Sequence, residues 1–198
     1  MTMREPPLTK VAAALGEPLG AQVLDGQAHL APVAVAGIQE TVVWRVRGES
    51  GPHPWQVYVG AWPGGSIRLL TADQDAWADL VGTTGVRLTN ASQAQSFVET
   101  FLEVTRGAMV IVRAVTSLDD IRWRPGSTEE ENAKTALLAD PPPTTPTVEP
   151  TADGFHIELT LVVDQRLQRN SFDLTSAGEI TRTSFRVLAE HLPLPVAR

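Results

Sequence analysis

The chain has 198 residues, a formal net charge of −7 and no cysteine. Its length allows a sizeable buried core, and its 42% hydrophobic and 20% charged residues are typical of a globular protein rather than a disordered one. The lack of cysteine excludes disulfides, thiolate nucleophiles, iron–sulfur clusters and cysteine-based zinc sites.

The excess negative charge lies in the middle of the chain. Residues 72–153 carry 13 acidic and six basic side chains, whereas the segments on either side are balanced. Negative charge repels phosphate backbones and anionic lipid surfaces, so we expect no nucleic-acid partner and no membrane partner. The same acidic stretch would suit a basic partner protein.

No stretch of the sequence has the pattern of a targeting or membrane segment. The apolar run 11–15 is too short for the core of a signal peptide, and no run approaches the ~20 apolar residues that span a bilayer. We therefore expect a cytoplasmic protein. Of the 16 basic residues 14 are arginine, which together with frequent alanine, valine, proline and glycine is typical of a GC-rich bacterial genome.

In chain order, residues 1–8 are predicted to be frayed, and a short helix over 10–15 follows the capping residue Thr9. Apolar residues that alternate between glycine and proline breaks then predict strands over the segments 29–36, 38–47, 55–62 and 66–71. The middle of the chain has helical patterns, each opened by a capping residue. The predicted caps are Thr71, Asn90, Ser117 and Ser127. The longest helix is expected over 92–106, and an apolar strand over 108–115 follows it.

The prolines of residues 140–153 predict an extended segment that is either a linker or a strap laid across the fold. After it, residues 154–190 are predicted to form a three-stranded antiparallel meander. Because three strands make a marginal domain alone, we expect the meander to complete the sheet begun earlier. The predicted fold is a single α+β domain over 1–198, with a mainly antiparallel sheet that is strongly bent or two-layered, a few packed helices and the C-terminal meander.

Alternation along the predicted strands sorts the aromatic residues between two faces of the sheet. Trp44 and Trp55 fall on the face of their valine neighbours and are predicted to lie in the core. Another set falls on the opposite, polar face. Its members are Arg45, Arg47, Tyr58, Trp62 and Arg68. Such a face can bind an anionic or planar ligand or a partner protein. It can also be an outer face partly covered by a helix, with arginines lying over the rings.

Catalytic signatures are few. The sequence contains no phosphate-binding loop, no nucleophile motif and no histidine pair at metal-ligand spacing, so no cofactor or metal is predicted. His156 and Glu158 are neighbours on one face of a predicted strand, and with Asp164 they are the candidates for acid–base chemistry. The other interpretation is a solvated pair on an exposed strand. Two runs of acidic residues, 119–120 and 129–131, fall in first turns of predicted helices, where the helix dipole favours negative charge.

These observations favour a non-enzymatic binding or accessory protein, chaperone-, immunity- or scaffold-like, that acts through a protein–protein interface. The alternative is a cofactor-free small-molecule-binding protein or enzyme of the isomerase or cyclase type, with a cavity enclosed by the curved sheet. Exposed edge strands leave a homo-oligomer open as well.

Overall fold

The computed structural model describes residues 6–49, 54–107, 110 and 112–194. The chain divides into two compact units. We call Met1–Ala108 with Ser176–Glu179 the N-terminal unit, and Met109–Thr175 with Ile180–Arg198 the C-terminal unit. The prediction of a single domain over 1–198 stays a prediction. Residues 1–5 of the segment expected to be frayed lie outside the described residues. The first helix begins at Leu8 after Pro7, so the prediction of Thr9 as its cap was wrong and Thr9 lies within the helix.

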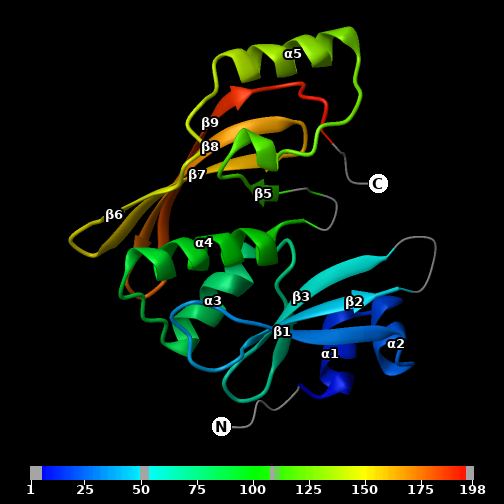
Figure 1. The fold of residues 1–198 in the computed structure, drawn as a ribbon. Coiled ribbons are helices and arrows are strands. Elements are labelled where there is room, and N and C mark those ends of the chain that lie inside the picture. Colours follow the sequence, from blue (N-terminus) through cyan, green and yellow to red (C-terminus); the bar gives the residue numbers. More distant parts are fainter. Residues whose placement is uncertain (1–5, 50–53, 108–109, 111, 195–198) are drawn as a thin grey trace. The chain divides into compact units, whose positions relative to one another are not determined.

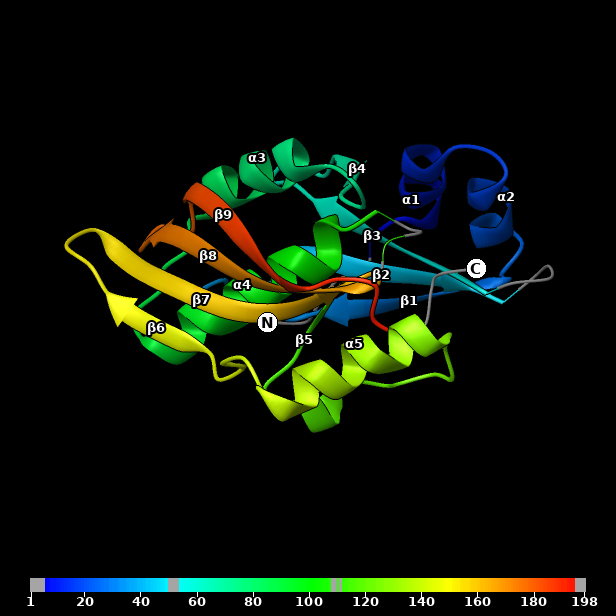
Figure 2. The ribbon, with the colours of Figure 1, turned by 90° about the horizontal axis from the view of Figure 1, so that it is seen from above.

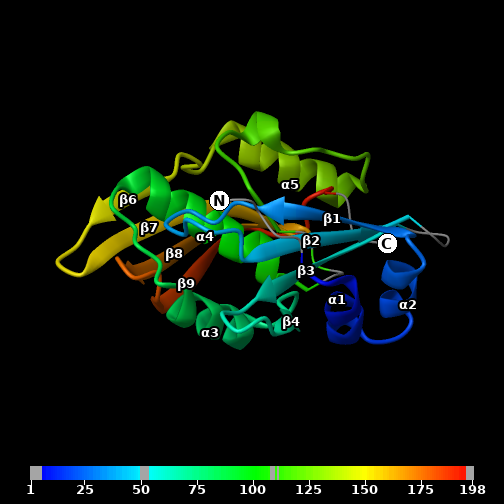
Figure 3. The ribbon, with the colours of Figure 1, turned by 90° about the horizontal axis from the view of Figure 1, so that it is seen from below.

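The N-terminal unit contains a four-stranded antiparallel sheet in the order β1-β2-β3-β4 (Figure 1, Figure 3). Its strands are β1 (Ala28–Val33), β2 (Val43–Gly48), β3 (Trp55–Ala61) and β4 (Ile67–Leu69). The strand predicted over 38–47 begins later than expected, because residues 36–40 form a turn and bends. A turn follows β3, in which the Gly65 N–H donates to the Trp62 carbonyl at 2.9 Å.

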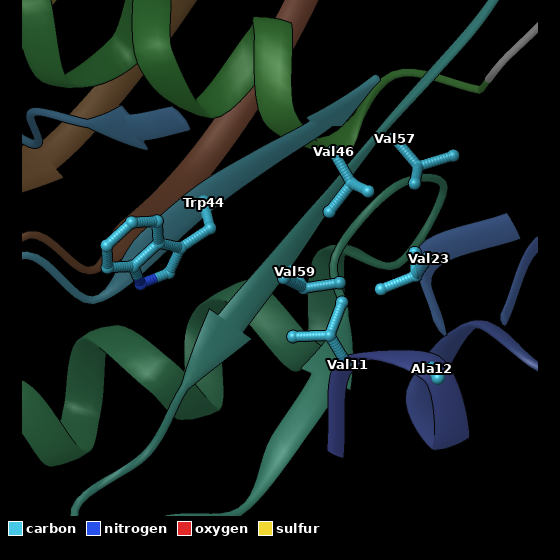
Figure 4. Close-up of a cluster of buried hydrophobic side chains, with 7 residues drawn as sticks. All are labelled: Val11, Ala12, Val23, Trp44, Val46, Val57 and Val59. Carbon is cyan, nitrogen blue, oxygen red and sulfur yellow. The ribbon is translucent and has the colours of Figure 1, made fainter. Parts of the chain in front are cut away.

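The valine-rich face of this sheet packs against two short helices, α1 (Leu8–Leu15) and α2 (Leu19–Leu24). α2 was not predicted, because six residues are too few for a clear helical period. The core cluster that the sheet shares with the two helices is drawn in Figure 4. It consists of Val11, Ala12, Val23, Trp44, Val46, Val57 and Val59.

The helices α3 (Gln74–Thr84) and α4 (Ala91–Thr105) contact β3 from its other face. Asn90 caps α4 as predicted, its side chain accepting from the Gln93 N–H. The cap of α3 was predicted wrongly: it is Asp73, whose carboxylate accepts from the Ala76 N–H at 2.8 Å. Thr71 instead accepts the Tyr58 N–H at 2.8 Å, because that strand amide lies within reach of its buried hydroxyl.

The C-terminal unit contains a five-stranded antiparallel sheet in the order β5-β7-β8-β9, with β6 also paired to β7. Figure 2 shows β6, β7, β8 and β9 side by side. The strands are β5 (Val112–Ala114), β6 (Thr147–Pro150), β7 (Gly154–Val163), β8 (Arg166–Thr175) and β9 (Ile180–Ala189). The expectation that the meander completes the first sheet is therefore wrong. It forms its own sheet, to which β5 and β6 supply the two additional strands.

A second core lies at the end of this sheet where β7 turns into β8. The short helix η1 (Leu118–Asp120) and α5 (Thr128–Ala139) contribute Leu118 and Leu137 to it, and the strands contribute Val162 and Leu167. Ser117 and Ser127 cap the two helices as predicted, each in a capping box. The predicted fold class, α+β with mainly antiparallel sheets and a C-terminal meander, is confirmed.

The turn between β8 and β9 packs in the N-terminal unit. The Leu88 N–H donates to the Ser176 carbonyl at 2.8 Å, and Gly178 has a positive φ of 82°. A Cβ atom at Gly178 would lie 2.8 Å from Val86 and 3.0 Å from Phe97, so this position requires glycine for its conformation and for the space around it.

Candidate functional site

The tryptophans predicted to be structural lie where the alternation of the strands puts them. Trp44 is only 2% exposed. Trp55 packs against the same cluster, and its indole N–H donates to the side-chain oxygen of Gln22 at 2.6 Å. The indole of Trp55 also covers Gly48 on the paired strand, where a Cβ atom would lie 2.3 Å from the ring. Both aromatic side chains therefore serve the core.

The predicted arginine–aromatic face exists as one face of the N-terminal sheet. The register pairs Arg45 with Tyr58 and Arg68 with Gly60, and Arg47 follows on the same side of β2. Burial divides this set, however. Tyr58 is 2% exposed and Trp62 8%, whereas Arg45, Arg47 and Arg68 lie at the surface.

The aromatic members of the face are bonded to the helices that cover it. The Tyr58 hydroxyl donates to the Glu103 carboxylate on α4 and accepts from the Gln56 amide at 2.7 Å. Burial, together with the hydrogen bond to Glu103 and its negative charge, raises the pKa of Tyr58 above its usual range. A neutral, hydrogen-bonded phenol of this kind positions α4 and is not a free ligand contact.

Trp62 and Arg68 meet at Asp79 of α3. The Trp62 indole N–H donates to the Asp79 carboxylate at 3.1 Å, and the Arg68 guanidinium donates to the same oxygen at 2.7 Å. The guanidinium also lies over the Trp62 ring, 4.8 Å from its centroid. This geometry fits the interpretation of a helix-covered face with an arginine over a ring. Arg47 is separate, exposed and 3.6 Å from Glu49.

His156 and Glu158 are neighbours on one face of β7, as predicted, but each is bound to a different partner and Asp164 lies apart from both. His156 Nδ1 lies 2.6 Å from the carboxylate of Asp173, a partner that the sequence analysis missed. Glu158 is held instead by Arg169, at 3.2 Å. Asp164 lies in the turn after β7, at a positive φ of 52°. Eight residues of extended strand, about 27 Å, separate it from His156.

Glu158 has an electrostatic environment unlike that of an acid catalyst. Partial burial raises the pKa of a carboxyl group, but the hydrogen bond and the charge of Arg169, with smaller contributions from Ser171 and His156, hold the pKa of Glu158 below its ordinary value. Glu158 is therefore ionised at neutral pH and bound to a cation. A general acid must instead carry a proton at the working pH, which requires a raised pKa.

Cross-strand pairing gathers polar residues on one face of the C-terminal sheet, which we call the polar face. Three rows cross β7, β8 and β9 in register. They are His156–Asp173–Arg182, Glu158–Ser171–Ser184 and Thr160–Arg169–Arg186. Of these nine residues, the sequence analysis placed only His156 and Glu158 together, because the neighbours on β8 and β9 depend on the register.

Arg169 is the buried centre of the polar face. Arg169 is 7% exposed, and its guanidinium donates to the Thr145 carbonyl at 3.0 Å, to Thr160 at 3.1 Å and to Glu158. Thr160 in turn donates to the Pro143 carbonyl at 2.8 Å. These bonds hold the proline-rich segment before β6, which we call the strap, against the sheet.

Next to Arg169 the polar face is hollowed into a groove of about 500 Å³. It is lined by Pro143, Thr147, Glu158, Arg169, Ser171, Ser184, Phe185 and Arg186. The last three of these belong to β9, so the groove extends to the outer strand of the sheet.

β9 is an edge strand of unusual exposure. It pairs with β8 on one side, and no strand of the described chain pairs with the other. Seven consecutive residues, 181–187, are exposed, which means that both faces of the strand reach solvent. Among them Phe185 is 64% exposed and Val187 37%. The sequence pattern carried no signal of this, because an alternating strand with Phe185 and Val187 on one side is typical of a half-buried one.

Acidic residues at the starts of η1 and α5 bond to nearby groups at the surface of the fold. Asp120 accepts from the N–H groups of Thr116 and Ser117, and these bonds hold its pKa below the ordinary value. Glu130 accepts from the Ser127 N–H at 2.7 Å, and Glu131 pairs with Lys134 at 3.7 Å. The acidic runs therefore act mainly as caps and first-turn charges, as the sequence analysis expected.

Within the described residues no group of three or more histidine or acidic side chains is arranged to hold a metal ion, and no helix is long and apolar enough to cross a membrane. Comparisons with protein-family models, with curated proteins and with solved structures found no significant match.

Proposed function

We propose that this chain is a non-enzymatic binding protein that adds an extended segment of a partner protein to the free edge of β9. The observation that carries the proposal is the exposure of residues 181–187, with Phe185 64% exposed at the centre of a ten-residue edge strand. A bare edge presents unpaired N–H and C=O groups to a partner strand, and its side chains supply the specificity.

The other sheet edges offer less to a partner. β4, at one edge of the N-terminal sheet, has three residues, and β1, at the other, has six and contains Pro32, which has no N–H to donate. Opposite β9, the edge of the C-terminal sheet is formed by the short strands β5 and β6. Long, exposed backbone is therefore concentrated at β9.

The alternative, a cofactor-free enzyme or small-molecule-binding protein, has weaker support. His156, Glu158 and Asp164 do not converge, and Glu158 is bound to Arg169. The cavity between η1 and the end of β7 measures about 130 Å³, less than the ~300 Å³ of a typical ligand pocket. The groove beside Arg169 is larger, about 500 Å³, but its carboxylate, Glu158, is already bound to Arg169. A protein-binding role of a chaperone, immunity or scaffold type fits β9 better. A basic partner, a cytoplasmic location and a bacterial origin stay predictions from the sequence.

A peptide that can form only strand contacts tests the proposal. The probe is a fluorescein-labelled ten-residue peptide of alternating glutamine and valine, compared with the same peptide N-methylated at every residue, which has no N–H group on either edge of the strand. We expect the first to bind and the second not to, because methylation removes the N–H groups that pair with β9. Fluorescence anisotropy measures binding, and hydrogen exchange should show new protection within 180–189.

Phe185→Lys with Val187→Lys should remove binding, since charged side chains block an edge strand. The matched control is Leu8→Lys with Leu24→Lys, which introduces the same charge at apolar positions of α1 and α2 that are 48% and 56% exposed. It should bind as the wild type does. Equal binding by the N-methylated peptide, or by the β9 double variant, would show that the peptide does not add to β9 and would end the proposal.

A further inference from the structure

We infer that the segment bound by β9 is acidic, with carboxylates at alternate positions. The inference rests on the proposed function and names the partner's chemistry. It is carried by the charges on β9 itself, where Arg182, Ser184 and Arg186 follow one another on the polar face. Phe185 lies on the opposite side of the strand.

The two arginines of β9 are not neutralised. Among the residues that the structure describes, neither Arg182 nor Arg186 takes part in an ion pair or a side-chain hydrogen bond, although both are exposed and belong to a chain of net charge −7. In a chain with this excess of acid, two unpaired guanidinium groups four residues apart on a free edge form a local cationic row.

The neighbours of the row on β8 leave its charge available. Arg186 lies directly opposite Arg169, a like charge, and the carboxylate of Glu158 that balances Arg169 is bound to it at 3.2 Å. Arg182 lies opposite Asp173, whose carboxylate already contacts His156 at 2.6 Å. An anion that approaches the outer edge of β9 therefore meets two cations. No carboxylate of β9 lies between Arg182 and Arg186.

A second copy of the chain is a poor occupant of this edge. Two β9 strands paired antiparallel around a two-fold axis keep the same face on the same side, so the arginine rows of both copies would lie together. In one register Arg182 faces Arg186 of the other copy directly. With the register centred on Phe185, each Arg186 has two arginines as diagonal neighbours. Like charges at these positions are destabilising. The arginines thus oppose self-pairing and favour a partner of opposite charge.

An acidic strand satisfies the same geometry. Alternate residues of an added strand fall on the polar face, where directly opposite Cβ atoms lie about 5 Å apart. Carboxylates at two such positions reach Arg182 and Arg186, and a guanidinium can hold a carboxylate through two parallel hydrogen bonds. The residues in between fall on the side of Phe185 and Val187, where apolar groups are favoured.

Three labelled peptides test the inference: ten residues of alternating glutamate and valine, glutamine and valine, and lysine and valine. For the wild-type protein at low ionic strength, we expect the glutamate peptide to bind about three- to tenfold more tightly than the glutamine peptide, since two exposed ion pairs are worth roughly that much. The lysine peptide should bind most weakly. The double variant Arg182→Glu with Arg186→Glu should reverse the order.

The matched control is Arg45→Glu with Arg47→Glu, which changes the total charge equally on exposed arginines of β2. It should keep the wild-type order. If the glutamate and glutamine peptides bind equally, the inference fails and strand addition stands. If neither binds, both fail. If the control pair loses the preference as fully as the β9 pair, the charge selection does not lie at β9. A concentration-dependent dimer that Phe185→Lys dissolves, measured by sedimentation, would identify a second copy as the occupant and overturn the inference.

Discussion

At the scale of single residues, the arginine–aromatic face shows how one set of side chains divides into two roles. Alternation places Arg45, Tyr58 and Trp62 on the same side of the sheet, and the register confirms this arrangement. Tyr58 and Trp62 then bind Glu103 and Asp79 on the covering helices. Their contacts fix α3 and α4, whereas Arg45 remains at the surface.

Trp62→Ala should therefore destabilise the protein, and Arg45→Ala should not. Removing an indole that is 8% exposed and bonded to Asp79 is expected to lower the free energy of unfolding by about 3 kcal/mol or more. Truncating exposed Arg45 should change it by less than about 0.5 kcal/mol. Urea denaturation followed by tryptophan fluorescence or circular dichroism gives both values. Equal midpoints for the two variants would contradict the burial of Trp62.

Glu158 gives a prediction of pH dependence. Partial burial raises the pKa of Glu158 in the folded protein, but the hydrogen bond and the charge of Arg169 outweigh this effect and hold the pKa below its ordinary value of 4.5. The unfolded chain therefore takes up a proton first as pH falls. The stabilisation from this carboxylate is complete well above pH 4.5 and is lost as pH falls through the lowered pKa of the folded state.

Glu158→Gln should lower the urea midpoint at pH 7, and the difference from wild type should shrink as pH falls below 4.5. The measurement is a series of urea titrations between neutral and acidic pH. A difference that stays constant across the series would mean that the Glu158 carboxylate gains nothing from Arg169 on folding. Asp164→Asn is a suitable control, because it removes the same charge from a residue in the turn at the far end of β7.

At the scale of elements, the strap before β6 depends on one buried cation. Arg169 holds the Thr145 carbonyl, Thr160 holds the Pro143 carbonyl, and β6 then pairs with β7. Proline makes this segment extended by itself. Hydrogen bonds from β7 and β8 determine that it lies against the sheet.

Arg169→Met should release the strap and leave Glu158 without its cation. We expect the free energy of unfolding to fall by about 2–3 kcal/mol, since a nearly buried charged group with several hydrogen bonds is lost. Cleavage within 140–149 by a protease of broad specificity should become faster. Arg166→Met is the control, since Arg166 is exposed and pairs only loosely with Glu190 at 3.5 Å. Unchanged cleavage in the Arg169 variant would mean that the strap is held by β6 alone.

Several elements were predicted from local signals, and others were not. The caps at Asn90, Ser117 and Ser127 were predicted because each bonds to a backbone group within three residues. The cap at Thr71 was predicted wrongly, because Asp73 competes for the same helix and Thr71 is used by Tyr58, 13 residues away. β6 was missed because Pro150 within it and Pro146 just before it argue against a strand, and only a strand at a sheet edge tolerates proline.

At the scale of the whole molecule, the sheet that was expected to be continuous is two sheets. The local patterns of 154–190 gave three strands correctly, but they hold no information on which strands lie beside them. β5 and β6 fill that edge and leave β9 at the opposite one. The proposed function depends on this choice of neighbours, since the same β9 sequence inside a sheet would have no free backbone groups.

The sequence by itself determined the α+β class, the antiparallel strands, most helix caps and the core position of Trp44. Each follows from alternation or from contacts a few residues apart, which the chain encodes locally. Only the tertiary structure decided that helices bury Tyr58 and Trp62, that Asp173 meets His156 and that Arg169 holds the strap. It also decided that Phe185 stands exposed on a free edge. These outcomes depend on which distant segments pack together, and a hydrophobic pattern shows that a face can be buried without showing what covers it.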